Sequence, residues 1–161
     1  VVAWLILSIQ AYFSGYMKGL DDRIRGEDGV GYFVYLPSII IDHDVDFFNN
    51  YQAIYGYKDG DVSAYGYRQK TDTGYTDNPW SIGPALAWSP FYVMAHVVSK
   101  VSNSIFNTNY RIDGYKGLYS VFIMFGQAIY GLIGCLFCYL FCREFFNKKI
   151  AVMGIMFFVK V

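Results

Sequence analysis

The sequence predicts an all-α polytopic membrane protein, in which transmembrane helices flank a long extracytoplasmic loop with juxtamembrane helices. Of the 161 residues, 55% are hydrophobic and only 16% are charged, whereas a soluble domain usually has about 25% charged residues. Residues 21–77 hold 11 of the 13 acidic and 5 of the 13 basic residues, a net charge of −6 in a neutral chain. Long uncharged apolar runs lie outside this acidic segment. The pattern excludes a basic nucleic-acid-binding face and a disordered chain.

The clearest transmembrane segment is residues 118–142, which contain no charged side chain. About 20 apolar residues cross the roughly 30 Å of hydrocarbon in a bilayer. Basic residues follow directly, at Arg143, Lys148 and Lys149. Because clustered basic residues mark the cytoplasmic side of a span, we expect a cytoplasmic turn over 143–149. A further transmembrane helix should then begin over 150–161.

A second apolar run occupies residues 1–20 and fades through Tyr16 and Lys18, an aromatic and basic boundary typical of a membrane interface. A cleaved signal peptide is the competing interpretation, but no small-x-small cleavage site precedes the acidic segment. We therefore expect a retained transmembrane helix. Since Val1 and Val161 both lie inside apolar runs, we also expect the chain to be the N-terminal fragment of a longer protein.

The uncharged run 79–98 is ambiguous because it contains three prolines. Polar residues recur here at spacings of three and four. They are Ser89, Tyr92 and His96 within the run, and Ser99 and Asn103 after it. Such spacing forms one polar stripe on a helix, which suits a helix that lies along the membrane interface. A span facing a wet cavity stays open as the alternative. If the run crossed the membrane, the basic cluster at 143–149 would lie outside, against the charge rule.

We therefore expect a flat juxtamembrane helix over 79–101 and an extracytoplasmic segment over 21–117. A second juxtamembrane helix is expected near 30–41, where an apolar stretch is interrupted by Pro37. A segment this long between spans is usually structured or functional.

A carboxylate pair, Glu27 and Asp28, follows the first apolar run. In one interpretation Asp28 caps a helix that starts near Val30, and Glu27 is solvated. In the other, Asp28 lies in a partly dry cleft against the bilayer, where loss of water contact would make it a usable general base. The spacing alone favours the cap.

The acidic run from Asp42 to Asp46 resembles the opening of a calcium-binding loop. An EF-hand is excluded, because Phe47 and Ala53 stand where that loop needs glycine and glutamate. Two interpretations stay open, a turn that closes the preceding helix and a looser divalent-cation site. The ligands of such a site would be Asp42, Asp44, Asp46 and Asn49.

Other residues offer less specific chemistry. Arg68 and Lys70 could approach a phosphate or be ordinary loop charges, and His96 could meet a substrate or be a satisfied interfacial histidine. Three cysteines share one helix face at Cys135, Cys138 and Cys142. We interpret them as small apolar residues and predict neither a zinc site nor a disulfide framework from them. No Walker loop, dinucleotide fingerprint or Ser-His-Asp order occurs.

Five short motifs follow one another along the chain. They are Asp28-(x)3-Tyr32, Asp42-x-Asp44-x-Asp46-(x)2-Asn49, Thr73-Gly74-Tyr75-(x)2-Asn78-Pro79, Ile82-Gly83-Pro84-Ala85-Leu86-(x)-Trp88-(x)-Pro90-Phe91 and Asp113-Gly114-Tyr115. Their order and spacing resemble the N-terminal part of the GT-C membrane glycosyltransferases. That superfamily includes the dolichyl-phosphate-mannose protein mannosyltransferases and the lipid A aminoarabinose transferases.

The resemblance implies transfer of a sugar, with inversion, from a polyprenyl-phosphate donor to an acceptor hydroxyl of unidentified nature. It implies a catalytic acidic residue in the first extracytoplasmic loop, beneath juxtamembrane helices. Asp28 matches this position by its spacing to Tyr32, and Glu27 stays open as a substitute. The substrate-binding candidates are Tyr32, Arg68, Lys70 and His96. The implied location is a bacterial inner membrane, with membrane lipid and the lipid-linked donor as partners, and a divalent cation as an open option.

Two other functions stay open. One is a non-enzymatic polytopic subunit whose acidic loop binds a partner protein. The other is a polymerase or ligase of surface polysaccharides, which shares the lipid-linked substrate. Because a few spans cannot enclose a donor pocket, we expect the fragment alone to be inactive.

Overall fold

The computed structural model describes residues 27–56 and 70–158, without the side chains of Glu27 and of residues 156–158. The described residues are mostly helical and contain no strand, which confirms the all-α class for this part of the chain. They form two compact units. We call residues 27–56 and 70–124 the first unit and residues 125–158 the second unit. The helix expected over 1–20 lies outside the described residues.

The first helical segment of the first unit has three pieces. They are α2 (Glu27–Phe33), α3 (Tyr35–Pro37) and a π-helical turn, η1 (Ser38–Asp42). The helix predicted near 30–41 is therefore present, and it begins earlier than predicted. Its interruption at Val34 lies one turn before Pro37, which has no N–H to bond the carbonyl of Phe33. The segment ends at His43, whose N–H bonds the Ser38 carbonyl and whose backbone is left-handed (φ 60°).

The acidic run between η1 and α4 (Phe48–Tyr55) is a turn held by its own carboxylates. Asp44 Oδ1 accepts hydrogen bonds from Ser38 Oγ at 3.0 Å and from the N–H of Asp46 at 3.2 Å. Asp46 Oδ1 accepts from the N–H of the first α4 residue at 3.3 Å and from that of Thr76 at 3.0 Å. The run therefore closes one helix and opens the next, as the simpler of the two interpretations predicts.

The longest helix of the first unit is α5 (Gly83–Phe106), with 24 residues. Pro90 lies inside it and lacks the N–H that would bond the carbonyl of Leu86. The hydroxyl of Ser89 donates to that carbonyl instead, at 2.8 Å. Because the orphaned acceptor is satisfied locally, the helix continues through the proline.

The polar stripe of α5 faces the protein, and its apolar side faces outward. Tyr92 and Ser99 are fully buried, and His96 and Asn103 are partly buried. The exposed face carries Leu86, Val93, Met94, Val97, Val98, Val101 and Ile105. A surface helix of a soluble protein shows the opposite arrangement. The first unit therefore presents an unusually apolar helix face, which we call the outer face of α5.

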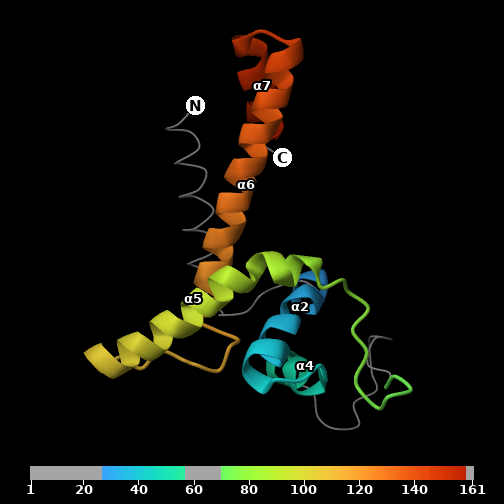
Figure 1. Cartoon of the computed structure of the whole chain (residues 1–161), viewed down its shortest axis with the longest axis vertical. Coiled ribbons are helices and arrows are strands. Elements are labelled where there is room, and N and C mark those ends of the chain that lie inside the picture. Colours follow the sequence, from blue (N-terminus) through green and yellow to red (C-terminus); the bar gives the residue numbers. More distant parts are fainter. Residues whose placement is uncertain (1–26, 57–69, 159–161) are drawn as a thin grey trace. The chain divides into compact units, whose positions relative to one another are not determined.

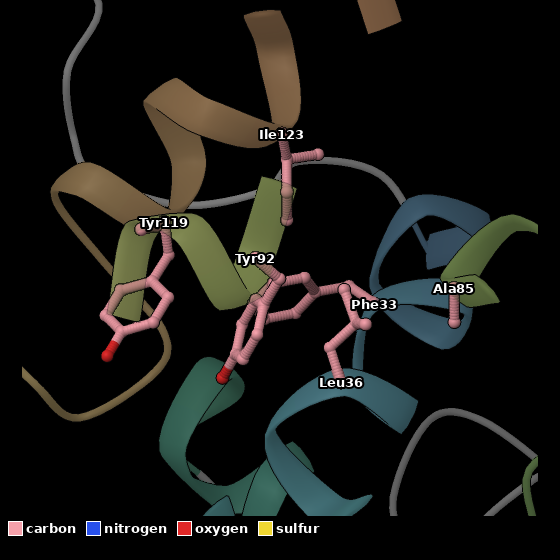
Figure 2. Packing of buried hydrophobic residues seen from close by; sticks show 7 residues of the cluster. Phe33, Leu36, Ala85, Tyr92, Tyr119 and Ile123 are labelled. Carbon is pink, nitrogen blue, oxygen red and sulfur yellow. The ribbon is translucent and has the colours of Figure 1, made fainter. Parts of the chain in front are cut away.

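The core of the first unit is built around Tyr92. Figure 2 shows its ring between Tyr119 on one side and Phe33 and Leu36 on the other, with Ile123 above it. The ring centroid lies 6.0 Å from that of Phe33 and 4.9 Å from that of Tyr119. Edge and tilted contacts of this kind add to the stabilisation from burial. Figure 1 shows α5 crossing α2, the contact that this core fills.

The hydroxyl of Tyr92 is buried and has no hydrogen-bond partner in the described ranges. Burial raises the pKa of Tyr92, and neighbouring tyrosines and carboxylates, Asp42 and Asp113 among them, raise it further. Gly114, with φ 87°, approaches the hydroxyl so closely that a Cβ would overlap it. A glycine is needed at 114 both for this positive φ and for the close approach.

In the described chain, only α6 (Leu118–Phe145) is long and apolar enough to cross a membrane, judged by length and composition. Its 28 residues extend about 42 Å, against roughly 30 Å of hydrocarbon. The helix begins where the sequence predicts and continues three residues beyond the predicted end at 142. In the second unit many of its large apolar side chains are exposed, such as Leu136 at 54% and Phe137 at 66%.

The second unit contains a further helix, α7 (Lys148–Phe158). It starts two residues before the predicted start at 150. Asn147 explains the difference, because its Oδ1 accepts the N–H of Ile150 at 3.1 Å and so caps the helix. The predicted turn over 143–149 is accordingly shorter, since Arg143 still belongs to α6.

Tyr92 offers a direct test of the core. Tyr92→Ala removes a buried ring, and we expect it to lower the free energy of unfolding by about 3–5 kcal/mol. Tyr92→Phe removes only an unpartnered hydroxyl, so we expect no loss and a gain of up to about 1 kcal/mol. Chemical unfolding in detergent, followed by circular dichroism, measures both. A loss greater than about 1 kcal/mol for Tyr92→Phe would show that the hydroxyl has a partner.

Candidate functional site

Asp28 lies in the first turn of α2, which already begins at Glu27. The prediction that Asp28 caps a helix starting near Val30 is therefore wrong. Its carboxylate is exposed, so the described residues do not form the dry cleft of the second interpretation either. One oxygen is nevertheless fixed, because Oδ1 accepts a hydrogen bond from the indole N–H of Trp80 at 2.9 Å.

The indole ring of Trp80 packs against the backbone of Gly31. A Cβ at position 31 would come within 2.6 Å of the ring atom Cγ and closer still to Cδ2 and Cε3. Gly31 lies three residues after Asp28, and residues at this spacing are neighbours on one helix face. Because Gly31 has no side chain, the indole can pack against the helix backbone there and donate to the carboxylate of Asp28.

The backbone of Trp80 is held from two sides. Its carbonyl accepts a hydrogen bond from the hydroxyl of Tyr35 at 2.6 Å. Its N–H donates to Asn78 Oδ1 at 3.3 Å. The side chain of Asn78 in turn donates to the carbonyl of Gly31 at 3.0 Å and accepts from the hydroxyl of Tyr51 at 3.1 Å. Residues 78–80 are thus tied to α2, α3 and α4 together.

We call Asp28, Gly31, Asn78 and Trp80 the indole clamp. It joins two segments about 50 residues apart in sequence and lies entirely within the first unit. Tyr32, four residues after Asp28, lies on the same side of α2 and is partly buried. Of the predicted site residues, Asp28 and Tyr32 are therefore brought together.

The other predicted site residues do not join this cluster in the described chain. The side chain of Glu27 and the whole of Arg68 lie outside the described residues. Lys70 is exposed and pairs through its backbone with Thr76 in an isolated bridge. His96 bonds the hydroxyl of Tyr119 in the core. The two loop cations remain predictions for phosphate contact.

The acidic run does not assemble into the cation site that the sequence leaves open. Asp42 Oδ2 accepts hydrogen bonds from Asn49 at 3.0 Å and from Asn50 at 2.8 Å. Asn50 also donates to the hydroxyl of Tyr115 at 2.8 Å, which links this turn to the loop before α6. Within residues 27–56 and 70–158, no three His, Cys, Asp or Glu side chains are grouped so that they could hold a metal ion.

The hydroxyl of Tyr115 is affected by this network. Burial raises the pKa of Tyr115, and the hydrogen bond with Asn50 opposes that effect. The carboxylates of Asp42 and Asp113 raise the pKa further. Tyr115 therefore remains a neutral hydroxyl that joins the acidic turn to the core.

His96 bonds Tyr119 across the interface between α5 and the first turn of α6. Its Nδ1 lies 2.6 Å from the Tyr119 hydroxyl. Burial lowers the pKa of His96, and Lys100 one turn later lowers it further. A neutral imidazole is thus favoured in the folded state, and its role in the described chain is to fasten two helices.

Sequence reasoning missed Trp80 and gave Asn78 no role beyond a motif. The only signal was an aromatic residue directly after Asn78-Pro79, and its contact with Asp28 spans 52 positions. Such a contact cannot be read from local spacing. Gly31 carried a clearer signal, because a glycine inside a helix weakens it and usually has a packing reason.

Comparison of this chain with protein-family models, with curated proteins and with solved structures finds no match.

The pKa of His96 leads to a test of stability against pH. The folded-state pKa is lowered, so the unfolded chain binds more protons below about pH 6.5, the ordinary histidine value. Stability from His96 is therefore full above that pH and falls as the pH drops below it. Thermal melting in detergent between about pH 5 and 8 measures this loss.

The chain supplies its own control, because its 161 residues contain two histidines, His43 and His96. His96→Asn should flatten the pH dependence, whereas His43→Asn, at an exposed left-handed position that asparagine tolerates, should leave it unchanged. Equal pH dependence in the wild type and in His96→Asn would contradict this assignment.

Proposed function

We propose that this chain belongs to an integral-membrane glycosyltransferase that moves a sugar from a polyprenyl-phosphate donor to an acceptor hydroxyl, with inversion and with Asp28 as the base. One observation carries the proposal. The Asp28 carboxylate is held at one oxygen by Trp80 and is otherwise exposed, in a unit whose longest helix has an apolar outer face. A base of this kind suits a hydroxyl that approaches along a lipid surface.

The outer face of α5 supports a position at the membrane interface. Exposed apolar patches of this kind mark interaction with membranes or other proteins, and a one-sided apolar helix lies in the plane of the interface. Although α5 has 24 residues, only α6 among the described helices has the composition of a span. The flat orientation therefore accounts better for α5 than a crossing does.

The charge pattern supports an orientation with residues 21–117 outside the cytosol. Arg143, Lys148 and Lys149 follow the apolar part of α6, and such residues favour the cytoplasmic side. The N-terminal end of α6, which directly follows residues 21–117 in the sequence, would then be on the extracytoplasmic side. We propose a bacterial inner membrane as the location, on the resemblance given by the sequence motifs.

The reaction is a single displacement. Asp28 takes the proton of the acceptor hydroxyl, the oxygen attacks the anomeric carbon, and the bond to the lipid phosphate breaks with its electron pair on the phosphate. Attack from the side opposite the phosphate inverts the anomeric carbon. The leaving phosphate needs stabilisation of its negative charge, and Lys70 and Arg68 are the proposed cations from this chain.

Separate substitution of the two adjacent carboxylates tests the proposal. Membranes with the complete protein and its native acceptor are incubated with radiolabelled undecaprenyl-phosphate mannose, glucose and galactose, and transfer is measured. Asp28→Asn keeps the shape of the side chain and removes the base, so kcat should fall at least about 100-fold. Glu27→Gln is the matched control and should retain most of the turnover.

Three outcomes would contradict the proposal. Unchanged transfer in Asp28→Asn would show that Asp28 is not the base, and loss confined to Glu27→Gln would move that role to its neighbour. Intact cellular function without transfer from any of the three donors would favour the non-enzymatic membrane subunit.

A further inference from the structure

The indole clamp bears on how the carboxylate of Asp28 is oriented. Asp28 is exposed, and an exposed carboxylate on a helix normally samples several rotamers. Here its one hydrogen bond in the described chain comes from Trp80 Nε1. An indole N–H is a donor only, so the carboxylate oxygen that it bonds, Oδ1, must be an unprotonated acceptor in this contact.

We infer that Trp80 is the positioning residue for the base, and that Oδ2 of Asp28 is the oxygen that takes the proton. This inference rests on the proposed function of Asp28. Oδ1 is occupied by the indole, whereas Oδ2 has no hydrogen bond within residues 27–56 and 70–158. The proton that leaves the acceptor hydroxyl therefore goes to Oδ2, while the acceptor oxygen forms the new bond to the anomeric carbon.

The donor itself is rigidly placed. The ring packs against Gly31, where a Cβ would overlap it. The backbone on either side of the ring is bonded to Tyr35 and Asn78. A donor held in advance does not have to reorganise during the reaction, and misplacement of a reacting group by about 1 Å can reduce the rate about 100-fold.

Asp28 is the carboxylate that the indole N–H of Trp80 bonds, at 2.9 Å.

The contact can be tested without turnover. The 161-residue chain has three tryptophans, Trp4, Trp80 and Trp88, and ¹⁵N labelling of this chain gives one indole N–H resonance for each. Trp80→Phe identifies its own resonance by deletion. Asp28→Ala removes the acceptor and should shift the Trp80 resonance, while that of Trp88 stays in place. An unmoved Trp80 resonance would overturn the hydrogen bond and the inference with it.

Kinetics then test positioning. Trp80→Phe keeps an aromatic ring and removes the N–H, so we expect kcat to fall about 10- to 100-fold with KM for the lipid-linked donor within about twofold of the wild type. Trp88→Phe, the same change in α5 with no hydrogen bond to Asp28 in the described chain, should leave kcat unchanged. Gly31→Ala should reproduce the loss by displacing the ring, with Asp28 and Trp80 both present.

The outcomes separate this inference from the proposed function. If Asp28→Asn abolishes transfer but Trp80→Phe keeps the wild-type kcat, Asp28 is the base and the positioning role is wrong. If Trp80→Phe changes only KM, the indole contacts the donor and does not orient the carboxylate, which also overturns the inference. If Asp28→Asn retains transfer, the proposed function fails, whatever the indole resonance shows.

Discussion

The fold of the first unit depends on the orientation of α5, which buries its polar side. Tyr92, Ser99 and His96 face the core, and a row of valines faces outward. Exposed apolar surface costs about 25 cal/mol for each Å² left in water, so an apolar medium that covers the outer face would stabilise this arrangement. The inward stripe in turn explains the composition of the core, in which tyrosines from α5 and the start of α6 pack on the phenylalanine and leucine of α2 and α3. The polar residues of the helix thus serve packing, and its apolar residues meet the surroundings.

The indole clamp lies in the same unit, but contacts other than those of the core form it. Once α5 covers α2, residues 78–80 run along α2 toward the start of α5, and Asn78 bonds the carbonyl of Gly31. Trp80 is then seated where only a glycine leaves room, and its N–H meets the carboxylate of Asp28. In the described chain, this exposed acid gains a defined orientation from one neutral donor, without an ion pair. Orientation of this kind is what a base needs when its proton donor arrives from outside the protein.

The sequence was sufficient for α6, the polar stripe of α5 and the helix near 30–41, but it predicted neither α4 nor the clamp. Period and charge predicted α6 and the polar stripe of α5, because a span and a one-sided helix both leave a regular pattern. The helix ends shifted where a single side chain decided them, as Asn147 does for α7. The direction in which the stripe faces could not be predicted, since the period is the same whichever side meets the core. The Asp28–Trp80 contact could not be predicted either, because it depends on the path of the chain between distant segments. The motif glycine at 114 acquires its meaning only beside Tyr92.

The central claim is that the outer face of α5 lies against lipid, and the accessibility of spin labels tests it most directly. Single nitroxide labels at Val93, Val97 and Val101 are compared with one at Asp72, an exposed residue of the polar turn between Lys70 and Thr76. Oxygen concentrates in the bilayer, and a water-soluble nickel chelate stays outside it. In liposomes that hold the complete protein, the three α5 labels should relax faster with oxygen than with the chelate, and the Asp72 label should show the reverse. Chelate accessibility at Val93, Val97 and Val101 equal to that at Asp72 would contradict the account.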